Sequence, residues 1–514
     1  MPLLVGLDIG TTAVKAGIYD SSGRVLAVAG QEYRIAHPAP DRAELDAETY
    51  WHATATAVRG ALAAAGADAT RVRSLAVSSQ GETVVAVDAH GRPLGPAIVW
   101  LDNRALAESR ELALQFDDAT VYDRTGVPSI TPTWPACKLL WWRRHEPDLF
   151  AGARRFLLVE DFLLHRLTGR YVTEGGVQST SLLFDIRSGG WWDAMLDAVG
   201  IDAGRLPGIV RPGSVVGGLS TDAAEVIGLP PGLAVVAGGM DQGAGAVGVG
   251  NVRAGMVSES TGGALTLQAS VDHHGGDPTG RTPVYVHSAP DRYLYCPVCP
   301  TGGMALTWFR DEFGADLVAR AAGDGSSAYD LLTELAAGVA PGADGLTMLP
   351  HLMGAFSPEY EPEARGAFYG FTLGHGRPHF VRAVLEAVAF MLRRNLELLA
   401  GAGAAATEIR SHGGGSRSRL WNQIKADACG LPVVTLEGDS AAVRGDAMIA
   451  GVAAGLFPDL AAACSAMVAV GDRYEPDPAA RSAYDDAYGR YVQLFDALRP
   501  LFSTRGLPQA DPLP

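Results

Sequence analysis

The order of apolar and polar positions predicts strands and helices that alternate along most of the chain. Apolar runs with β-branched residues predict strands over 3–7, 13–19, 25–29, 72–78, 84–88, 98–101, 233–237 and 409–412. Longer runs with helical spacing predict helices over 46–64, 304–313, 379–400, 420–429, 446–456 and 479–498. Such alternation is typical of α/β proteins. At 514 residues the chain is too long for one core, so we expect at least two domains.

The first turn of the amino-terminal strands carries residues suited to phosphate. It contains Asp8, Gly10, Thr11 and Thr12. Glycine frees the backbone, so exposed amides and two hydroxyls would cradle a phosphate group. Asp8, at the end of a strand, is placed to hold Mg²⁺, usually through water. An ordinary Asp-Gly hairpin is the alternative interpretation.

A second acidic residue follows the predicted strand 233–237. After Gly238-Gly239 the next charged side chain is Asp241, and four glycines follow it before residue 251. Open α/β sheets hold their ligands just beyond strand ends. An isolated carboxylate there suggests a general base, although a turn aspartate that caps the next helix has the same local sequence.

Polar clusters end other strands in both halves of the chain. Residues 79–83 and 102–104 follow apolar runs and contain Glu82 and Asp102, for which a solvated turn remains the alternative. In the second half, residues 260–263 and 413–416 form glycine turns between predicted elements. The turn at residues 8–12 in the first half and the turn at residues 260–263 in the second half would hold a nucleotide's phosphates from both sides of a cleft.

Charge and cysteine content narrow the class of partner. The chain has 41 Lys and Arg against 57 Asp and Glu, a net charge of −16, which disfavours nucleic acid and anionic membranes. It has no apolar run of the roughly 18 residues that a spanning helix needs, and no secretory leader pattern, so we expect a cytoplasmic protein. The five cysteines are scattered, and for Cys296 and Cys299 reduced thiols are favoured over a zinc site.

With these turns in place, the chain resembles the FGGY family of carbohydrate kinases over nearly its whole length. The resemblance rests on six segments in the family's order. They are LDIGTTAVKAGIYD at the start, the segment from SSQGETVV to VWLDNR, Pro135-x-x-Lys138-Leu139-x-Trp141, GGMDQGAGAVGVG with STGG, Gly366-x-Phe368-x-Gly370-Phe371 followed by His379-Phe380 and Glu386, and GGGSRSRLWNQIKADACGLPV.

The resemblance implies an α/β protein of the actin-like, ribonuclease-H-like ATPase fold. Two domains with mixed five-stranded sheets would surround a deep cleft. We expect an N-terminal kinase domain over 1–245, a C-terminal kinase domain over 246–498 and a tail over 499–514. Dimers are common in the family, and the sequence is silent on oligomeric state.

The resemblance also implies that the protein phosphorylates a sugar or polyol with ATP, and it implies which residues take part. ATP and Mg²⁺ are the expected cofactors, and a small sugar is the expected substrate, with neither nucleic acid nor membrane as partner. Asp241 would act as the base and Asp8 would hold the metal. The nucleotide would contact Gly10, Thr11, Thr12, Thr261, Gly262, Gly263, Gly303, Thr307, Gly414, Gly415 and Ser418. The sugar would contact Gly81, Glu82, Trp100, Asp102, Asp241 and Gln242.

The sugar-binding segment favours a ketopentose. Glycerol kinases usually show Arg-Glu where this chain has Gly81-Glu82, which argues against glycerol. Xylulokinases usually have Met-His-Gly, and this chain keeps the glycine. D-xylulose is therefore the first expectation, with other pentuloses, sugar alcohols and aldonic acids left open.

Two other classes of protein share this fold: an actin-like ATPase module and a sugar sensor that has lost its chemistry. The first calls for an added peptide-binding domain or a polymer interface. The second should have lost Asp8 or Asp241, and both are present.

Overall fold

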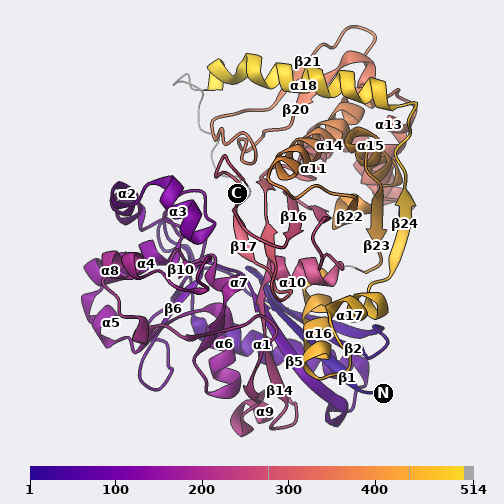
Figure 1. Cartoon of the computed structure of the whole chain (residues 1–514). Helices are drawn as coiled ribbons and strands as arrows, with labels where there is room; N and C mark the ends of the chain where they lie inside the picture. Colours follow the sequence, from indigo (N-terminus) through magenta and orange to yellow (C-terminus); the bar gives the residue numbers. More distant parts are fainter. Residues whose placement is uncertain (276, 439, 503–514) are drawn as a thin grey trace. The chain divides into compact units, whose positions relative to one another are not determined.

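The computed structural model describes residues 1–275, 277–438 and 440–502 and divides into two compact units (Figure 1). Of the described residues, the first unit comprises those within 1–254, 268–296 and 437–469, and the second comprises those within 255–267, 297–436 and 470–502. The chain therefore passes between the units more than once. Because the two units are interleaved along the sequence, they do not test the expected division at 245/246, which stays a prediction.

The first unit is built on a mixed sheet in the strand order β13-β14-β5-β1-β2-β3. Within the described residues this sheet has six strands rather than the expected five, because the short β13 pairs antiparallel with β14 at one edge. Its strands are β1 (Leu3–Ile9), β2 (Ala13–Asp20), β3 (Val25–Glu32), β5 (Val72–Ser79), β13 (Val215–Gly218) and β14 (Ala234–Met240).

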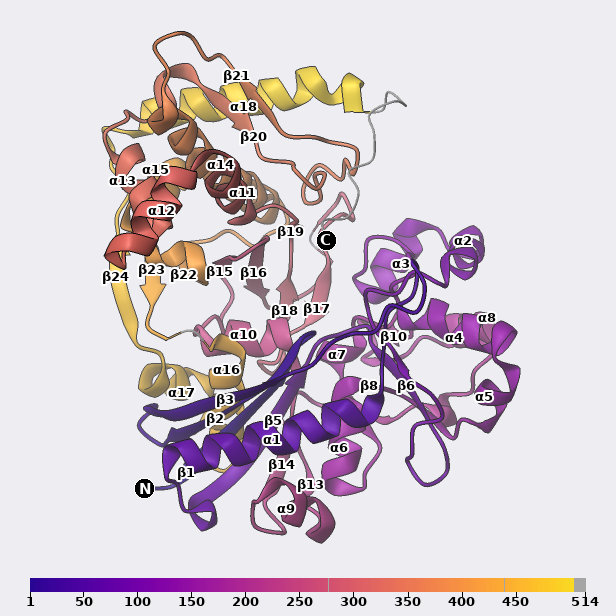
Figure 2. The same ribbon diagram turned by 180° about the vertical axis from the view of Figure 1, so that it is seen from behind.

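Alternate residues of the central strands enter two separate cores. Leu3, Val5 and Leu7 pack with helix α1 (Ala47–Ala65), which lies along the sheet in Figure 2. Leu4 belongs instead to the core that contains helix α16 (Ala441–Ala453). This is the period-two pattern of a strand that is buried on both faces.

Smaller elements complete the first unit. Its remaining strands are β4 (Glu44–Leu45), β6 (Val84–Val87), β7 (Ala97–Ile98), β8 (Arg155–Leu158), β9 (Val172–Glu174), β10 (Phe184–Asp185), β11 (Gly190–Trp191), β12 (Gly208–Val210), β17 (Val284–Val286) and β18 (Tyr293–Tyr295). Its other helices are α2 (Leu106–Gln115), α3 (Asp118–Thr125), α4 (Pro135–His145), α5 (Pro147–Gly152), α6 (Val159–Thr168), α7 (Gly175–Gln178), α8 (Asp193–Val199), α9 (Thr221–Ile227), α10 (Asp241–Gly248) and α17 (Leu460–Met467).

The second unit contains the strands β15 (Met256–Thr261), β22 (Glu408–His412), β23 (Val433–Leu436) and β24 (Val470–Tyr474), which neighbour one another in that order. Strand β16 (Leu265–Val271) begins in this unit, where it pairs with β19 (Val298–Cys299), and β20 (Thr347–Leu349) pairs with β21 (Ala367–Tyr369). The helices are α11 (Met304–Phe313), α12 (Ala315–Asp324), α13 (Ala328–Ala337), α14 (Arg377–Gly401), α15 (Arg419–Cys429) and α18 (Arg481–Phe502).

Several predicted boundaries move. The strand predicted over 98–101 ends at Ile98, because the chain turns and leaves Trp100 and Leu101 partly exposed. The helix predicted from Asp446 begins at Ala441. Helix α18 continues to Phe502, and the rest of the predicted tail lies outside the described residues. In the described part of the chain, no helix combines the length and the apolar character needed to cross a bilayer.

Candidate functional site

Three parallel strands of the first unit end at the same edge of its sheet. Strand β5 pairs in parallel with both β1 and β14, and Ser78 lies opposite Asp8 on one side and Gly239 on the other. Asp241 follows β14 directly, as the first residue of α10. The fold thus brings together Asp8 and Asp241, the two carboxylates that the sequence singled out in turns far apart along the chain.

The direction of Asp241 is set by an irregularity at the end of β14. The register with β5 shifts between Ala237 and Gly239, and Gly239 has a φ of 98°, which favours glycine. Its N–H donates to Glu160 Oε1 at 2.9 Å. A bulge re-aims the residues that follow it, so this contact helps to direct the start of α10.

The environment of Asp241 raises the pKa of its carboxyl. Desolvation raises its pKa to about 8, and the neighbouring carboxyls of Asp8 and Glu82 contribute in the same direction. Interactions with Gln242 oppose the rise. A carboxyl whose pKa lies near the working pH suits general base catalysis.

Asp8 has the properties of a cation ligand. Desolvation raises its pKa to about 6, and Lys15, its cross-strand partner, opposes the rise. Its buried Oδ1 has no hydrogen-bond partner in the described part of the chain. No cluster of three or more His, Cys, Asp or Glu was found among the described residues. Mg²⁺, however, commonly takes one or two carboxylates together with water and phosphate oxygens, so Asp8 fits it.

Asp446, on α16, is a third carboxyl near this edge that the sequence analysis missed. Its Oδ2 accepts a hydrogen bond from Ser78 Oγ at 2.7 Å, whereas its buried Oδ1 has no partner among the described residues. Burial raises its pKa well above the usual range, and Asp8 and Asp241 add to the rise. An acidic residue inside an apolar helix, between Gly445 and Ala447, was the signal available in the sequence.

The turn of Gly10, Thr11 and Thr12, predicted to contact phosphate, is hydrogen-bonded to Trp100, which is predicted to contact the sugar. Trp100 Nε1 donates to Thr11 Oγ1 at 2.9 Å, and the Gly10 N–H donates to the Ala13 carbonyl at 3.0 Å. Thr12 is exposed and Trp100 is 37% exposed. The turn therefore presents polar groups beside an accessible indole ring.

Glu82 is held in a left-handed conformation with a φ of 55°. Its N–H donates to Thr180 Oγ1 at 3.1 Å, and an alanine Cβ at Gly81 would meet that same oxygen at 2.6 Å. The buried Lys138 Nζ donates to the carbonyls of Glu82 and Val99, both at 3.0 Å. Lys138 was not predicted as a site residue, although a lysine in the apolar run ACKLLWW pointed to a special environment.

Two other predicted sugar-side residues are engaged with the protein itself. The fully buried Asp102 accepts from the Ala43 N–H at 2.6 Å and from Arg104 through both carboxylate oxygens. Gln242 Oε1 accepts from Gln268 Nε2 at 2.7 Å. Direct sugar contacts by Asp102 and Gln242 stay predictions.

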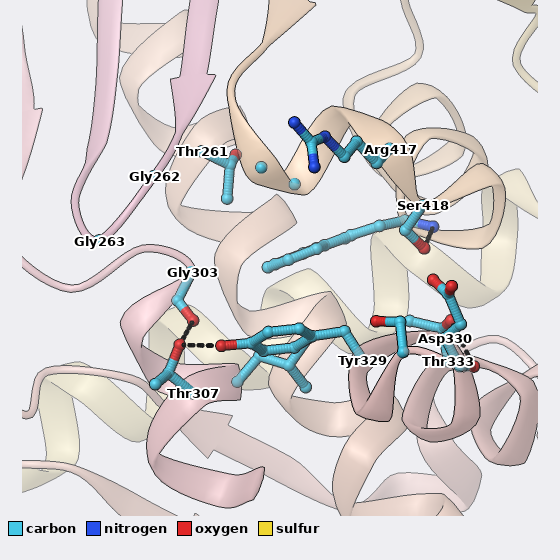
Figure 3. A pocket seen from close by; sticks show the side chains of 15 residues that line it. Thr261, Gly262, Gly263, Gly303, Thr307, Tyr329, Asp330, Thr333, Arg417 and Ser418 are labelled. Carbon is cyan, nitrogen blue, oxygen red and sulfur yellow. Dashed lines mark hydrogen bonds between the residues drawn. The ribbon is translucent and has the colours of Figure 1, made fainter. Parts of the chain in front are cut away.

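The second unit contains a pocket of about 320 Å³ that is lined by all eight residues predicted there for the nucleotide (Figure 3). These are Thr261, Gly262, Gly263, Gly303, Thr307, Gly414, Gly415 and Ser418. The turn after β15, the start of α11 and the turn before α15 meet because Gly303 N donates to Gly262 O at 2.7 Å and Gly415 has no side chain to displace Thr261. Three glycine turns that are far apart in sequence thus form one cavity.

The rest of the lining was not predicted. Helix α13 contributes Tyr329, whose hydroxyl lies 3.0 Å from Thr307 Oγ1, and Figure 3 shows Arg417 and Ser418 on the opposite side. The further lining residues are Leu306, Ser327, Asp330, Thr333, Arg417 and Trp421. Helix α13 carries no glycine or hydroxyl motif, so its approach to the pocket had no local signal.

The buried carboxyls predict an unusual pH dependence of stability. Burial raises the pKa of Asp161 and of Glu174 to about 7. A raised pKa means that the folded state holds protons that the unfolded state releases, so the free energy of unfolding falls as pH rises through this window. Burial lowers the pKa of His287 and His351 to about 4, which reduces stability only as pH falls below about 6.5. Burial also lowers the pKa of Lys138 to about 7, which opposes the trend, but the buried carboxyls with raised pKa values outnumber this one lysine.

In buffer without divalent ions, the melting temperature should therefore rise when pH is lowered from 8 to 6.5. The expected gain in unfolding free energy is about 1 kcal/mol or more, since each pKa unit corresponds to about 1.4 kcal/mol. Asp161→Asn should reduce the gain, measured by thermal melts at several pH values. A melting temperature that is flat or falling over this range would contradict the prediction.

Comparison with known proteins matches the sequence to one family and the fold to solved structures. Residues 3–248 match the N-terminal domain of the FGGY family of carbohydrate kinases, and residues 274–454 match its C-terminal domain. The gluconokinase of Bacillus subtilis (strain 168) is 28% identical over 515 residues, covering 99% of this chain and 98% of that protein. The xylulose kinase of Escherichia coli (strain K12) is 29% identical over 511 residues, covering 98% of this chain and 100% of that protein. The crystal structure of xylulose kinase from Rhodospirillum rubrum has a TM-score of 0.89 and 31% identity, over 98% of this chain and 100% of that chain.

Proposed function

Because this chain belongs to the FGGY family of carbohydrate kinases, and is therefore a sugar kinase, we propose that it transfers the γ-phosphate of ATP to a hydroxyl of an uncharged ketopentose, D-xylulose in the first place. The observation that carries the proposal is the position of Asp241, a carboxyl at a strand end with a pKa of about 8 and the carboxyls of Asp8 and Glu82 as neighbours.

Asp241 is proposed as the general base. A sugar hydroxyl is a weak nucleophile, and the transferring phosphoryl group spreads its charge over three oxygens in a loose transition state. As the hydroxyl oxygen forms its bond to phosphorus and the bond to ADP breaks, the hydroxyl proton passes to the Asp241 carboxylate. Its raised pKa favours that transfer.

Each unit by itself carries groups suited to part of a nucleotide. The pocket of the second unit would take the nucleoside, since its volume and glycine turns suit a base, a ribose and adjoining phosphates. The turn of Gly10, Thr11 and Thr12 would add amide and hydroxyl donors to phosphate oxygens. Asp8 would hold Mg²⁺, which when bound neutralises charge on the β- and γ-phosphate oxygens.

The charges around Asp241 favour an uncharged sugar over a sugar acid. A sugar acid would need a positively charged partner for its carboxylate. The charge of Arg104 is already balanced by Asp102 and Glu44, and burial lowers the pKa of Lys138 to about 7, which reduces its positive charge. The acidic groups nearest Asp241 are the carboxyls of Asp8 and Glu82, so a sugar carboxylate bound close to them would meet like charge. This repulsion opposes binding of an aldonic acid.

The substrate preference is tested by following ADP release from the purified full-length protein with D-xylulose, D-gluconate and a panel of other ketoses and polyols. We expect kcat/KM for D-xylulose to exceed that for D-gluconate. Glu82→Gln should reduce the ratio of kcat/KM for D-xylulose to that for D-gluconate by about tenfold. The substitution removes one negative charge that repels the gluconate carboxylate, an effect of about 1.4 kcal/mol. Faster turnover of D-gluconate would contradict the assignment of an uncharged substrate.

The same assay separates the other classes of protein that share this fold. ATP hydrolysis that needs no sugar would favour an ATPase module, and no turnover with any sugar would favour a sensor.

A further inference from the structure

A buried ion pair lies beneath the Thr261–Gly263 turn of the second unit. Lys425 Nζ on α15 lies 2.6 Å from Glu259 Oε1 on β15, and both side chains are 0% exposed. Desolvation makes such pairs costly, and apolar residues of similar size are often equally stable in their place. Stability alone therefore gives little reason for this pair.

The pair holds the hydroxyl of Thr261 from two sides. Lys425 Nζ donates to Thr261 Oγ1 at 2.9 Å, and Thr261 Oγ1 donates to Glu259 Oε2 at 2.7 Å. Ser411 Oγ also donates to Glu259 Oε1. Because the Thr261 hydroxyl is directed to this pair, we expect the turn to meet phosphate through its backbone.

Two walls of the pocket depend on these contacts. A Cβ at Gly415 would come within 2.7 Å of Thr261 Cβ, so the third glycine turn packs directly on the fixed threonine. Lys425 Nζ lies 5.4 Å from the centre of the Trp421 ring, which also lines the pocket. A shift of Lys425 would therefore disturb both the Thr261 turn and the indole.

We propose that Lys425 and Glu259 are positioning residues for nucleotide binding, which act by fixing Thr261 and Trp421 in the walls of the pocket. The inference rests on the proposed function, in which this pocket takes ATP. The pair itself need not touch the nucleotide. Loss of the pair changes the KM and the dissociation constant for ATP, and it leaves the KM for the sugar unchanged.

The test is the double variant Lys425→Met/Glu259→Leu, which removes both charges and leaves neither one buried and unpaired. We expect a melting temperature near that of the wild type, an increase of about tenfold in the dissociation constant and KM for ATP, and an unchanged KM for the sugar. Thr261→Val, which removes only the hydroxyl, should raise the same two ATP constants. It carries the test if the double variant does not fold.

A matched control is available in the same unit. Arg382 and Glu386 form another buried ion pair, at 2.8 Å on α14, and neither lines the pocket. Arg382→Met/Glu386→Leu should leave ATP binding unchanged, with a melting temperature again near that of the wild type. If this control weakens ATP binding as much as Lys425→Met/Glu259→Leu does, the pair has no specific role and the inference is overturned.

Calorimetric titration of MgATP into the wild type separates the two levels of the proposal. A wild type that binds no ATP overturns the proposed function and this inference with it. A wild type that binds ATP, with a folded double variant that binds it equally well, overturns the inference alone.

Discussion

Asp241→Asn should lower kcat by roughly 10²–10⁴-fold, the range that general base catalysis contributes. An amide cannot accept the hydroxyl proton, so phosphoryl transfer would lack the group at the end of β14 that takes it. Steady-state ADP release at saturating sugar and ATP measures the loss. The substitution also removes a carboxyl whose raised pKa reports a cost of ionisation in the folded state, so the melting temperature should stay the same or rise.

Asp197→Asn is the matched control for this prediction, because Asp197 is exposed on α8 of the same unit. It should leave kcat, ATP binding and the melting temperature unchanged. Near-normal turnover by Asp241→Asn would contradict the assignment of the base. A loss of ATP binding or of fold in that variant would show that Asp241 acts through structure.

Gly248→Ala should destabilise the first unit by about 3 kcal/mol or more, at the upper end of the cost of overpacking. A Cβ at Gly248 would lie 1.8 Å from the Ala441 carbonyl oxygen, and one at Gly445 would lie 1.8 Å from the Ala244 carbonyl oxygen. Helices α10 and α16 thus touch backbone to backbone, and an added methyl group must push them apart. Denaturant unfolding measures the loss.

Gly245→Ala, three residues earlier on the same helix, is the matched control. Its Cβ would meet no atom within 4 Å. It should be neutral or stabilise the protein by up to about 1 kcal/mol, through the higher helix propensity of alanine. Equal effects of the two substitutions would contradict the proposed helix contact. Since α10 begins with Asp241, we also expect a folded fraction of Gly248→Ala to lose activity.

The hydrophobic pattern and the turn residues determined the local structure of this protein. The predicted helix 304–313 has the bounds of α11, and the helix predicted over 46–64 is α1, which begins one residue later with Asp46 as its N-cap. The glycine and hydroxyl turns could be located because their residues are adjacent in sequence and depart from both helical and strand spacing. Seven residues from such turns, together with Thr307 of α11, line one pocket.

Only the tertiary structure decided what surrounds these turns. Asp446 accepts from a serine 368 positions earlier in the chain, and helix α13 reaches the pocket without a motif of its own. Lys425 is 166 residues from Glu259 in the sequence, and each residue alone gives the pattern of an ordinary charged side chain. Desolvation and hydrogen bonding between such distant residues set the pKa of Asp241 and the direction of the Thr261 hydroxyl. Local sequence determines where a turn forms, whereas burial depends on which segments the fold packs against it.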